Sequence, residues 1–289
     1  MDIPSLKAFL SVAEHASFSV AAQELHLTQP AISKRIALLE DQLGVRLFDR
    51  VARNISLTEY GQQLIPRARH ILRSVEDTKR ELLDATHKIS GPLSLAISHH
   101  IGLHRLPPVL RQFSAQHPAV ALDIRFTDSE AAYAAVLHGD IELAVITLAP
   151  SDAPQITSQM IWPDPLCFVA GEDHPLANRR ALRLPQLSEY PAIIPGESTY
   201  TGLIIKSLFA QQNLELTVSM ATNYLETIKM MASIGLGWSI LPETMLDRKL
   251  LRLRVTGIQL ERRLGCIYHR DRQLSNAAKA FMDTLAANH

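Results

Sequence analysis

The sequence predicts an α+β multidomain protein with a small helical N-terminal module, a long connecting helix and a larger C-terminal α/β domain. The chain has 289 residues, which is more than one ordinary hydrophobic core accommodates. Helical periodicity dominates up to about residue 87, whereas beyond residues 90–92 (SGP) short apolar runs alternate with helical patterns. Hydrophobic residues make up 47% of the chain and charged residues 20%, which excludes global disorder.

Three helices are expected in residues 1–44. Apolar residues at helical spacing predict a first helix from residue 3 to about His15. A second helix should follow Ser17 and Ser19, because either hydroxyl is able to cap exposed backbone amides. Thr28 is placed to cap a third helix in the same way, with Pro30 in its first turn, where a proline loses no hydrogen bond.

The third helix has two contrasting faces. Its apolar side chains fall at spacings of four, three and four residues and predict one buried stripe: Ile32, Ile36, Leu39 and Leu43. The opposite face carries short side chains and one cation: Pro30, Ser33, Lys34 and Ala37, with Gln29 and Arg35 on its flanks. Small side chains let a helix enter a major groove, where Gln, Ser and Lys reach base edges and phosphates. This helix is therefore the candidate DNA reader, and Gly44 is expected to end it.

A short hairpin, or wing, is expected over residues 45–57. Arg50 and Arg53 lie at or near its tip, where guanidinium groups suit contacts with phosphates or the minor groove. Leu47, Phe48 and Leu57 should cover the helical core. Spacing alone leaves open that this region is only a three-helix core with solvated charges.

Four motifs follow one another in this region: residues 17–22 (SFSVAA), 28–36 (TQPAISKRI), 43–50 (LGVRLFDR) and 57–61 (LTEYG). In this order they resemble the DNA-binding signature of LysR-type transcription regulators. The resemblance implies a bacterial winged helix-turn-helix domain over residues 1–58 that binds double-stranded DNA. It maps four residues of the third helix to base-reading positions and two arginines to the wing. The expected DNA-contacting residues are Ser17, Thr28, Gln29, Pro30, Ser33, Lys34, Arg35, Arg50 and Arg53.

One long helix is expected from Thr58 to about His87, within a linker of residues 59–89. Its apolar stripe repeats near every 3.5 residues and implies a partner helix, although packing against the chain's own body is an alternative. Pro66 predicts a bend or an early break. In the resembled family this helix forms the homodimer, which places two reading helices on a near-palindromic operator. Homotetramers are common in that family.

The rest of the chain predicts an α/β domain built from two sets of elements. The first set comprises strands over residues 93–97, 121–126 and 142–146 with helices over 106–116 and 130–137. The second set opens after residues 162–165 (WPDP) with a strand over 166–170, a helix after residue 201, a strand over 216–221, a helix over 223–234 and a turn into a buried strand over 235–242. A last strand over 264–269 leads to a terminal helix over 275–285.

Three further motifs extend the resemblance along this domain: residues 139–145 (GDIELAV), 174–177 (HPLA) and 235–237 (GLG) followed by 241–242 (LP). They imply a periplasmic-binding-protein-like effector domain over residues 90–289. Lobe I is expected to hold residues 92–162 and 270–289, and lobe II residues 163–269. A small effector, polar or anionic, should bind between the lobes and control transcription.

The candidate effector contacts follow from the ends of the predicted strands. Ligands of α/β sheets settle beyond the carboxyl ends of strands, near helix N-termini with free amides. The residues at those positions are Ser98, His99, His100, Ser129, Thr147, Ser198, Thr199 and Thr201. For each serine and threonine, helix capping is an equally good explanation. His99, His100 and His104 are accompanied by no carboxylate or thiol at ligand spacing, so a loop at the cleft rim is expected in place of a metal site.

Enzymatic function is not expected. The sequence carries no Gly-x-Ser-x-Gly, P-loop or His-Glu-x-x-His motif, and we expect no cofactor and no metal. The alternative function is that of a solute-binding or transport-type binding protein without DNA function, whose core would look like residues 92–289. Such a protein would, however, have a signal peptide and no reading helix.

Charge and cysteine content add little to the predicted function. Twenty-nine basic residues balance 29 acidic ones, so any DNA footprint must be local. The N-terminus lacks a signal-peptide pattern and no apolar run approaches the roughly 20 residues that span a bilayer. We therefore expect a cytoplasmic protein without membrane contact. Cys167 and Cys266 lie in apolar runs and are expected to be small buried residues, with a redox switch as the alternative.

Overall fold

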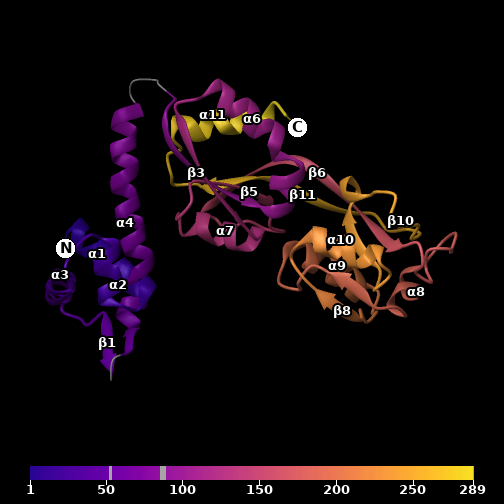
Figure 1. Ribbon diagram of the computed structural model, residues 1–289, viewed down its shortest axis with the longest axis horizontal. Helices are drawn as coiled ribbons and strands as arrows, with labels where there is room; N and C mark the ends of the chain where they lie inside the picture. Colours follow the sequence, from indigo (N-terminus) through magenta and orange to yellow (C-terminus); the bar gives the residue numbers. More distant parts are fainter. Residues whose placement is uncertain (52–53, 85–88, 289) are drawn as a thin grey trace. The chain divides into compact units, whose positions relative to one another are not determined.

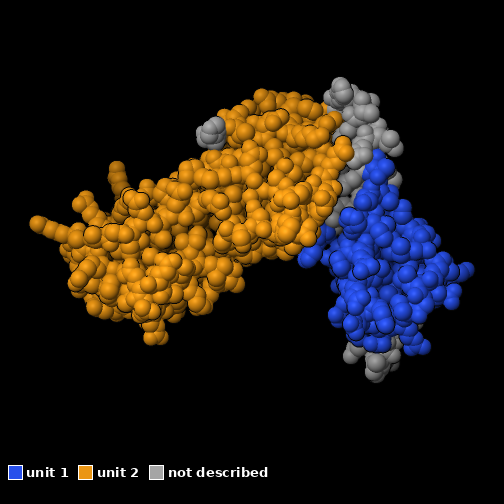
Figure 2. All heavy atoms as spheres, turned by 180° about the vertical axis from the view of Figure 1, so that it is seen from behind, with its two compact units in different colours: residues 1–86, 138–140 blue, residues 87–137, 141–289 orange. Residues whose placement is uncertain are grey.

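The computed structural model describes residues 1–51, 54–84 and 89–288, and it divides into two compact units (Figures 1 and 2). Unit 1 comprises residues 1–86 with 138–140, and unit 2 comprises residues 87–137 with 141–289. Within the described ranges, no helix combines the length and the apolar character needed to cross a membrane.

Unit 1 consists of three short helices, a hairpin and one long helix: α1 (Ile3–His15), α2 (Phe18–Glu24), α3 (Gln29–Leu43), β1 (Phe48–Val51), β2 (Asn54–Leu57) and α4 (Glu59–Asp84). The predicted caps are confirmed, since the Ser17 hydroxyl accepts a hydrogen bond from the Val20 amide (3.3 Å) and the Thr28 hydroxyl accepts one from the Ala31 amide (3.4 Å). Gly44 follows α3 with a φ of 70°, a left-handed conformation that glycine adopts without steric cost. The hairpin predicted after it is also confirmed, with β1 antiparallel to β2.

The core of unit 1 forms where the helices meet the hairpin. Ile32, Ile36 and Leu39 of α3 have no exposed surface, as their spacing predicted. The prediction was wrong for Leu43, which is 38% exposed. Leu43 lies in the last turn of α3, directly before the chain turns away at Gly44, so the end of the helix extends past the core.

Helix α4 continues through Pro66, so the break predicted there does not occur. Pro66 is exposed and its missing hydrogen bond is offset by packing on the other side of the helix. There Leu64, Ile65 and Ala68 join the core of unit 1. The first part of the apolar stripe therefore packs against the chain's own module, which was the alternative to a partner helix.

Unit 2 contains, within the described residues, a seven-stranded mixed sheet of β3 (Gly91–Ser98), β4 (Val120–Thr127), β5 (Leu143–Thr147), β6 (Ile156–Gly171), β9 (Ser239–Pro242), β10 (Leu250–Leu253) and β11 (Leu260–His269). The order across it is β10-β6-β11-β5-β3-β4, with β9 also paired to β6. Strand β3 is parallel to β4 and β5, whereas β11 is antiparallel to β5 and β6. A separate parallel pair is formed by β7 (Ala192–Ile194) and β8 (Val218–Ala221).

The helices of unit 2 are α5 (His99–His104), α6 (Leu106–Gln116), α7 (Ser129–Leu137), α8 (Leu184–Ser188), α9 (Tyr200–Gln211), α10 (Leu225–Ser233), the 3-10 turn η1 (Glu243–Met245) and α11 (Asn276–Ala286). In lobe I, α6 and α11 lie on one face of the sheet and α7 on the other (Figure 1). Leu95 and Ile97 of β3 join the core beneath α6 and α11, while Ala96 between them joins the core that includes α7. This alternation of side chains confirms the predicted α/β architecture.

One long strand, β6, connects the two lobes. The predicted strand start at Leu166 was wrong, because β6 already begins at Ile156 and runs unbroken through Pro163 and Pro165. These prolines are two residues apart and both exposed, so their missing N–H groups fall on one edge of the strand only. Strand β11 pairs with β6 from Ile156 to Leu166, and this antiparallel pair carries the sheet from one lobe into the other.

Both cysteines are buried, as predicted. Cys167 is 3% exposed and Cys266 is fully buried. Burial raises the pKa of each thiol to about 11, which keeps both sulfur atoms protonated near neutral pH.

Candidate functional site

The exposed face of α3 is the first candidate surface. Thr28, Gln29, Pro30 and Lys34 are exposed, while Ser33 on the same face and the flanking Ser17 and Arg35 are half-buried. Arg53 lies outside the described residues, and so does the side chain of Arg50, whose backbone belongs to β1. Because the buried stripe fixes the rotation of α3, the short side chains and the Lys34 ammonium face away from the core and are accessible to a nucleic acid.

Two polar side chains that the sequence reasoning missed hold the hairpin against the helices. One carboxylate oxygen of Glu40 accepts hydrogen bonds from the amides of Leu47 (2.7 Å) and Phe48 (3.3 Å). The Thr58 hydroxyl donates to the carbonyl of Arg46 (2.7 Å). These bonds connect the end of α3 and the start of α4 to the base of the hairpin. The wing is therefore held in a defined orientation relative to the helix that precedes it.

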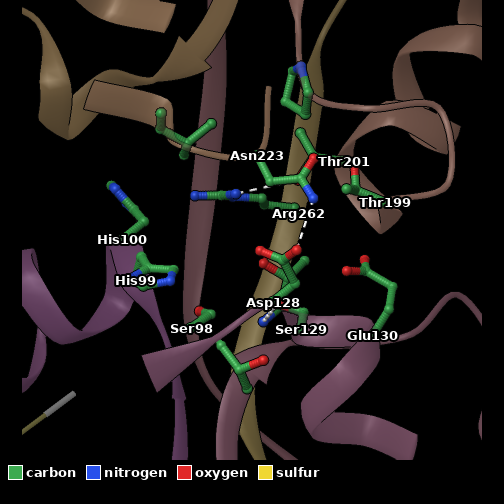
Figure 3. Close-up of a pocket in the computed structure, with 14 residues that line it drawn as sticks. Ser98, His99, His100, Asp128, Ser129, Glu130, Thr199, Thr201, Asn223 and Arg262 are labelled. Carbon is green, nitrogen blue, oxygen red and sulfur yellow. Dashed lines mark hydrogen bonds between the residues drawn. The ribbon is translucent and has the colours of Figure 1, made fainter. Parts of the chain in front are cut away.

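A cavity of about 50 Å³ between the two lobes of unit 2 is the second candidate site (Figure 3). Lobe I contributes residues at the carboxyl ends of β3, β4 and β5, and lobe II contributes residues before α9 and α10. The lining comprises Ser98, His99, His100, Thr127, Asp128, Ser129, Glu130, Thr147, Pro195, Thr199, Thr201, Asn223, Leu225 and Arg262. Parallel strands bring their carboxyl ends to one edge of a sheet, which explains why residues far apart in sequence meet here.

The structure brings the predicted effector contacts together at this cavity, except for Ser198. Ser198 is exposed and does not line the cavity. Three of the predicted hydroxyls already have structural partners, one of them Thr201, which accepts from Nη1 of Arg262. Thr199 caps α9 by accepting from the Gly202 amide (2.9 Å), and Ser129 accepts from the Thr147 amide (3.1 Å). Ser98 makes no capping hydrogen bond to α5, so its hydroxyl remains available to a ligand.

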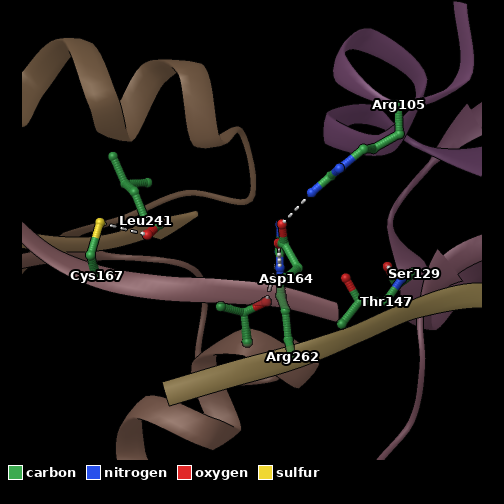
Figure 4. Close-up of polar contacts among 8 residues, drawn as sticks. Arg105, Ser129, Thr147, Asp164, Cys167, Leu241 and Arg262 are labelled. Atoms are coloured by element: carbon green, nitrogen blue, oxygen red, sulfur yellow. Dashed lines mark hydrogen bonds and ion pairs between the residues drawn. The ribbon is translucent and has the colours of Figure 1, made fainter. Parts of the chain in front are cut away.

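Arg262 is the main cavity residue that the sequence reasoning missed. Its side chain is 5% exposed, its Nε donates to Asp164 (2.6 Å) and its Nη1 donates to Thr201 (3.2 Å). Asp164 has no exposed side-chain surface and also pairs with Arg105 at 3.4 Å (Figure 4). Burial lowers the pKa of Arg262, which the charge of Asp164 opposes. Within the described residues, Nη2 of Arg262 is buried without a hydrogen-bond partner, so one guanidinium donor is free at the cavity.

His100 adds a second set of free polar atoms. It is 5% exposed, and neither ring nitrogen has a hydrogen-bond partner in the described part of the chain. Burial, together with the charge of Arg262, lowers the pKa of His100 to about 3. The imidazole is therefore neutral at physiological pH, with one N–H donor and one nitrogen lone pair.

Hydrogen bonds and ring contacts hold the lobes together around the cavity. A carboxylate oxygen of Asp128 accepts from the Asn223 side-chain amide (2.7 Å), and Glu130 accepts from the Tyr200 amide (2.6 Å). The rings of His99 and Tyr224 lie 5.0 Å apart. Each contact joins lobe I to lobe II, so all of them would have to break for the lobes to separate here.

Family comparisons cover almost the whole chain. The model described as "Bacterial regulatory helix-turn-helix protein, lysR family" matches residues 3–62, and the model described as "LysR substrate binding domain" matches residues 86–289. These two matches coincide with the helix-turn-helix region and with the domain that holds the cavity.

Curated relatives and solved structures agree with these matches. The chain is 28% identical over 289 residues to the RuBisCO operon transcriptional regulator of Allochromatium vinosum, with 98% of this chain and 95% of that protein covered. It is 62% identical over 108 residues to an uncharacterized HTH-type transcriptional regulator of Azotobacter vinelandii, covering 37% of this chain and 75% of that protein. Its fold is similar to that of full-length CbnR complexed with its target DNA, with a TM-score of 0.69, 22% identity and full coverage of both chains.

Proposed function

The chain belongs to the LysR family of DNA-binding transcription regulators, and we propose that it binds a near-palindromic operator as a dimer and responds to a small anionic effector held between its lobes. The family assignment replaces the alternative of a transport-type binding protein, since the matched relatives are transcriptional regulators. We assign DNA binding to residues 1–58, the linker to 59–89 and effector binding to 90–289. As the family acts in transcription, we further propose that the protein has no enzymatic activity and works in the cytoplasm.

The division of α3 into two faces carries the DNA-binding proposal. Ile32, Ile36 and Leu39 are fully buried in unit 1. The opposite face presents Gln29, Ser33 and Lys34, residue types that suit contacts in a major groove. Ser17, Thr28 and Arg35 flank this face and suit phosphate contacts. The arginines of the wing, Arg50 and Arg53, are assigned to the same surface. A fold relative, CbnR, has been solved with its target DNA, which supports a DNA-binding role for this architecture.

Helix α4 supports dimer formation beyond the region where it packs on its own module. It extends to Asp84, and Val75 remains partly exposed past the residues that join the core. We propose that this outer part pairs with α4 of a second chain, and that dimers associate further into a tetramer. A two-fold axis then presents two α3 helices to two half-sites of an operator.

The cavity supports an anionic effector of small size. Arg262 lines it with an Nη2 group that has no hydrogen-bond partner among the described residues, and Ser98, Thr147 and Thr201 line the same space. The lining residues His99, His100, Ser129 and Thr199 complete the assigned contacts. A guanidinium with free N–H donors binds a carboxylate more strongly than neutral donors do. The volume of about 50 Å³ suits a ligand group of a few non-hydrogen atoms.

We predict that Lys34→Ala weakens operator binding by about 1–3 kcal/mol, or roughly 5–150-fold, with the fold intact. The side chain is exposed on α3 and reaches a base edge or phosphate without supporting the core. A gel-shift titration on the DNA upstream of the chain's own gene measures this at fixed salt. Lys7→Ala, an exposed lysine on α1, serves as the matched control and should bind normally. Equal affinities for Lys34→Ala and wild type would remove Lys34 from the reading surface.

A second prediction tests the cavity. A substitution of Thr199 would also disturb the fold, because its hydroxyl caps α9. Thr147→Val is the cleaner test, because it keeps the side-chain shape and removes one hydroxyl. We expect the melting-temperature increase given by a binding carboxylate to shrink, with affinity reduced by about 0.5–1.5 kcal/mol. Thermal denaturation with a panel of small carboxylates measures this, with the exposed Thr244→Val as control. A carboxylate that stabilises Thr147→Val as much as wild type would place its binding elsewhere.

A further inference from the structure

Three metal-ligating side chains from both lobes meet beside the effector cavity. His100 and His104 come from α5 in lobe I, and Glu226 comes from the first turn of α10 in lobe II. One ligand atom of each lies within 4.8 Å of the others. The Nε2 of His104 is 2.8 Å from Oε1 of Glu226, and the rings of His100 and His104 are 4.8 Å apart. The carboxylate that the sequence lacked at ligand spacing is therefore supplied by a distant segment.

The donor set and its spacing suit a transition metal ion. Residues four apart on a helix share one face, so His100 and His104 are able to bind a single ion together. Two imidazoles and one carboxylate leave a fourth position open, as in three-ligand zinc sites. With zinc–ligand bonds of about 2.0–2.1 Å in a tetrahedral arrangement, ligand atoms stand about 3.3 Å apart. The observed separations of up to 4.8 Å require only small side-chain movements to reach that value.

His100 supplies an independent indication of a ligand. Its ring is buried, and both nitrogens are without hydrogen-bond partners among the described residues. Buried polar atoms are almost always paired, so an orphan of this kind calls for a binding partner. By contrast, His104 and Glu226 are each more than one-third exposed in their side chains, which leaves a route for an ion from solvent.

The surrounding charges permit a divalent cation. Arg105 and Arg262 are the nearby cations that act on His100, and both pair with Asp164. Counting Asp164 and Glu226 against the two arginines leaves no net positive charge, so an incoming ion meets no uncompensated repulsion. Imidazole ligands favour zinc, nickel, cobalt and copper over magnesium or calcium, which prefer oxygen.

We propose that His100, His104 and Glu226 bind a first-row divalent metal ion, with zinc as the best fit, and that this ion joins the two lobes. Its ligands belong to different lobes, so the site is complete only while the lobes are in contact here. A ligand that binds one state preferentially shifts the population toward that state. The metal ion is thus a second input to the effector domain. His104 and Glu226 do not line the effector cavity, so they are the ligands that distinguish the metal site from it.

Cobalt binding to the full-length protein tests the proposal. Protein stripped with EDTA and dialysed should bind about one Co²⁺ per chain with visible d–d absorption, and Zn²⁺ should displace it whereas Mg²⁺ should not. Zn²⁺ should also raise the melting temperature of unit 2. His104→Ala and Glu226→Gln should each weaken Co²⁺ binding at least tenfold, since even changes behind the ligands commonly cost about 10–100-fold.

The chain offers a matched control in unit 1. Nε2 of His15 lies 3.3 Å from a carboxylate oxygen of Glu24, a histidine–glutamate pair outside the proposed cluster. His15→Ala should leave cobalt affinity unchanged, and metal-free melting curves show whether each variant is folded. Cobalt affinity equal in wild type, His104→Ala and Glu226→Gln would overturn the proposal, and so would wild-type protein that takes up no cobalt. Neither result would bear on operator binding or on the carboxylate response, which are measured separately.

Discussion

Replacing Asp164 with alanine should lower the free energy of unfolding of the effector domain by about 3–5 kcal/mol. Asp164 has no exposed side-chain surface, binds Nε of Arg262 at 2.6 Å and pairs with Arg105 at 3.4 Å (Figure 4). Without it, the Arg262 guanidinium is left buried with no counter-ion. Breaking a buried ion pair by removing one partner costs more than the pair contributed, because the remaining charge is uncompensated.

Urea denaturation followed by tryptophan fluorescence measures this loss, since both tryptophans of the chain, Trp162 and Trp238, lie in unit 2. The double variant Asp164→Leu with Arg262→Met should recover most of the stability, as it removes both charges together. Asp123→Ala is the control, because its partner Arg125 is 3.8 Å away and both side chains are more than half exposed. A surface pair of this kind contributes about 0–1 kcal/mol. If Asp164→Ala were no more destabilising than Asp123→Ala, the buried cluster would have no structural role.

Helix-turn-helix features could be predicted because they depend on neighbours in sequence. Caps at Ser17 and Thr28, the stripe on α3 and the turn at Gly44 each follow from a few consecutive residues. The strands of lobe I were predicted for the same reason, since a buried run bounded by turn residues is a local signal. Leu43 was wrongly predicted to be buried, because the point at which a helix extends past the core depends on tertiary packing.

Residues whose roles depend on distant partners could not be predicted. The last strand was predicted to start at residue 264, whereas β11 already begins at Leu260 and places Arg262 beside Asp164, 98 residues away in sequence. Glu226 reaches His104 across 122 residues. The pattern of a single sequence does not reveal such pairing. A charged residue looks the same in the sequence whether it lies in a strand or in a loop, and its distant partner is not marked. The carboxyl ends of the predicted strands could be located from the sequence, and the polar residues at those ends do line the cavity, except for Ser198.

The effect of Pro66 illustrates a competition between local and tertiary terms. A proline inside a helix removes a hydrogen bond and disfavours continuation, which predicted a bend or an early break. The apolar side chains on the opposite side of α4 bury enough surface in unit 1 to hold the helix continuous. The same packing buries the first part of the apolar stripe of α4, from which a partner helix was predicted. The part of α4 beyond Leu72 is the part that we assign to pairing with a second chain.

Trp238→Ala should destabilise lobe II by about 3–5 kcal/mol, the usual cost of removing a large buried aromatic side chain. Trp238 is fully buried, and its ring packs against Phe209 and Phe168 with centroids 5.9 and 6.0 Å away. Its Nε1 donates to the carbonyls of Leu187 and Tyr190, each at 3.0 Å. The alanine variant therefore leaves a cavity and two carbonyls without this donor, directly before the strand β7 that leads to the cavity loop at residues 195–201.

Trp238→Phe separates the two contributions, because it keeps most of the aromatic packing and removes only the N–H donor. We expect it to cost about 1–3 kcal/mol, clearly less than the alanine change. Urea denaturation followed by the remaining Trp162, together with circular dichroism, measures both variants. Equal losses for the two variants would mean that hydrogen bonding, and not packing, holds this core, and a loss below about 1 kcal/mol for Trp238→Ala would contradict the burial argument. Because the loops of lobe II that line the cavity depend on this core, the alanine variant should also lose the carboxylate-induced rise in melting temperature.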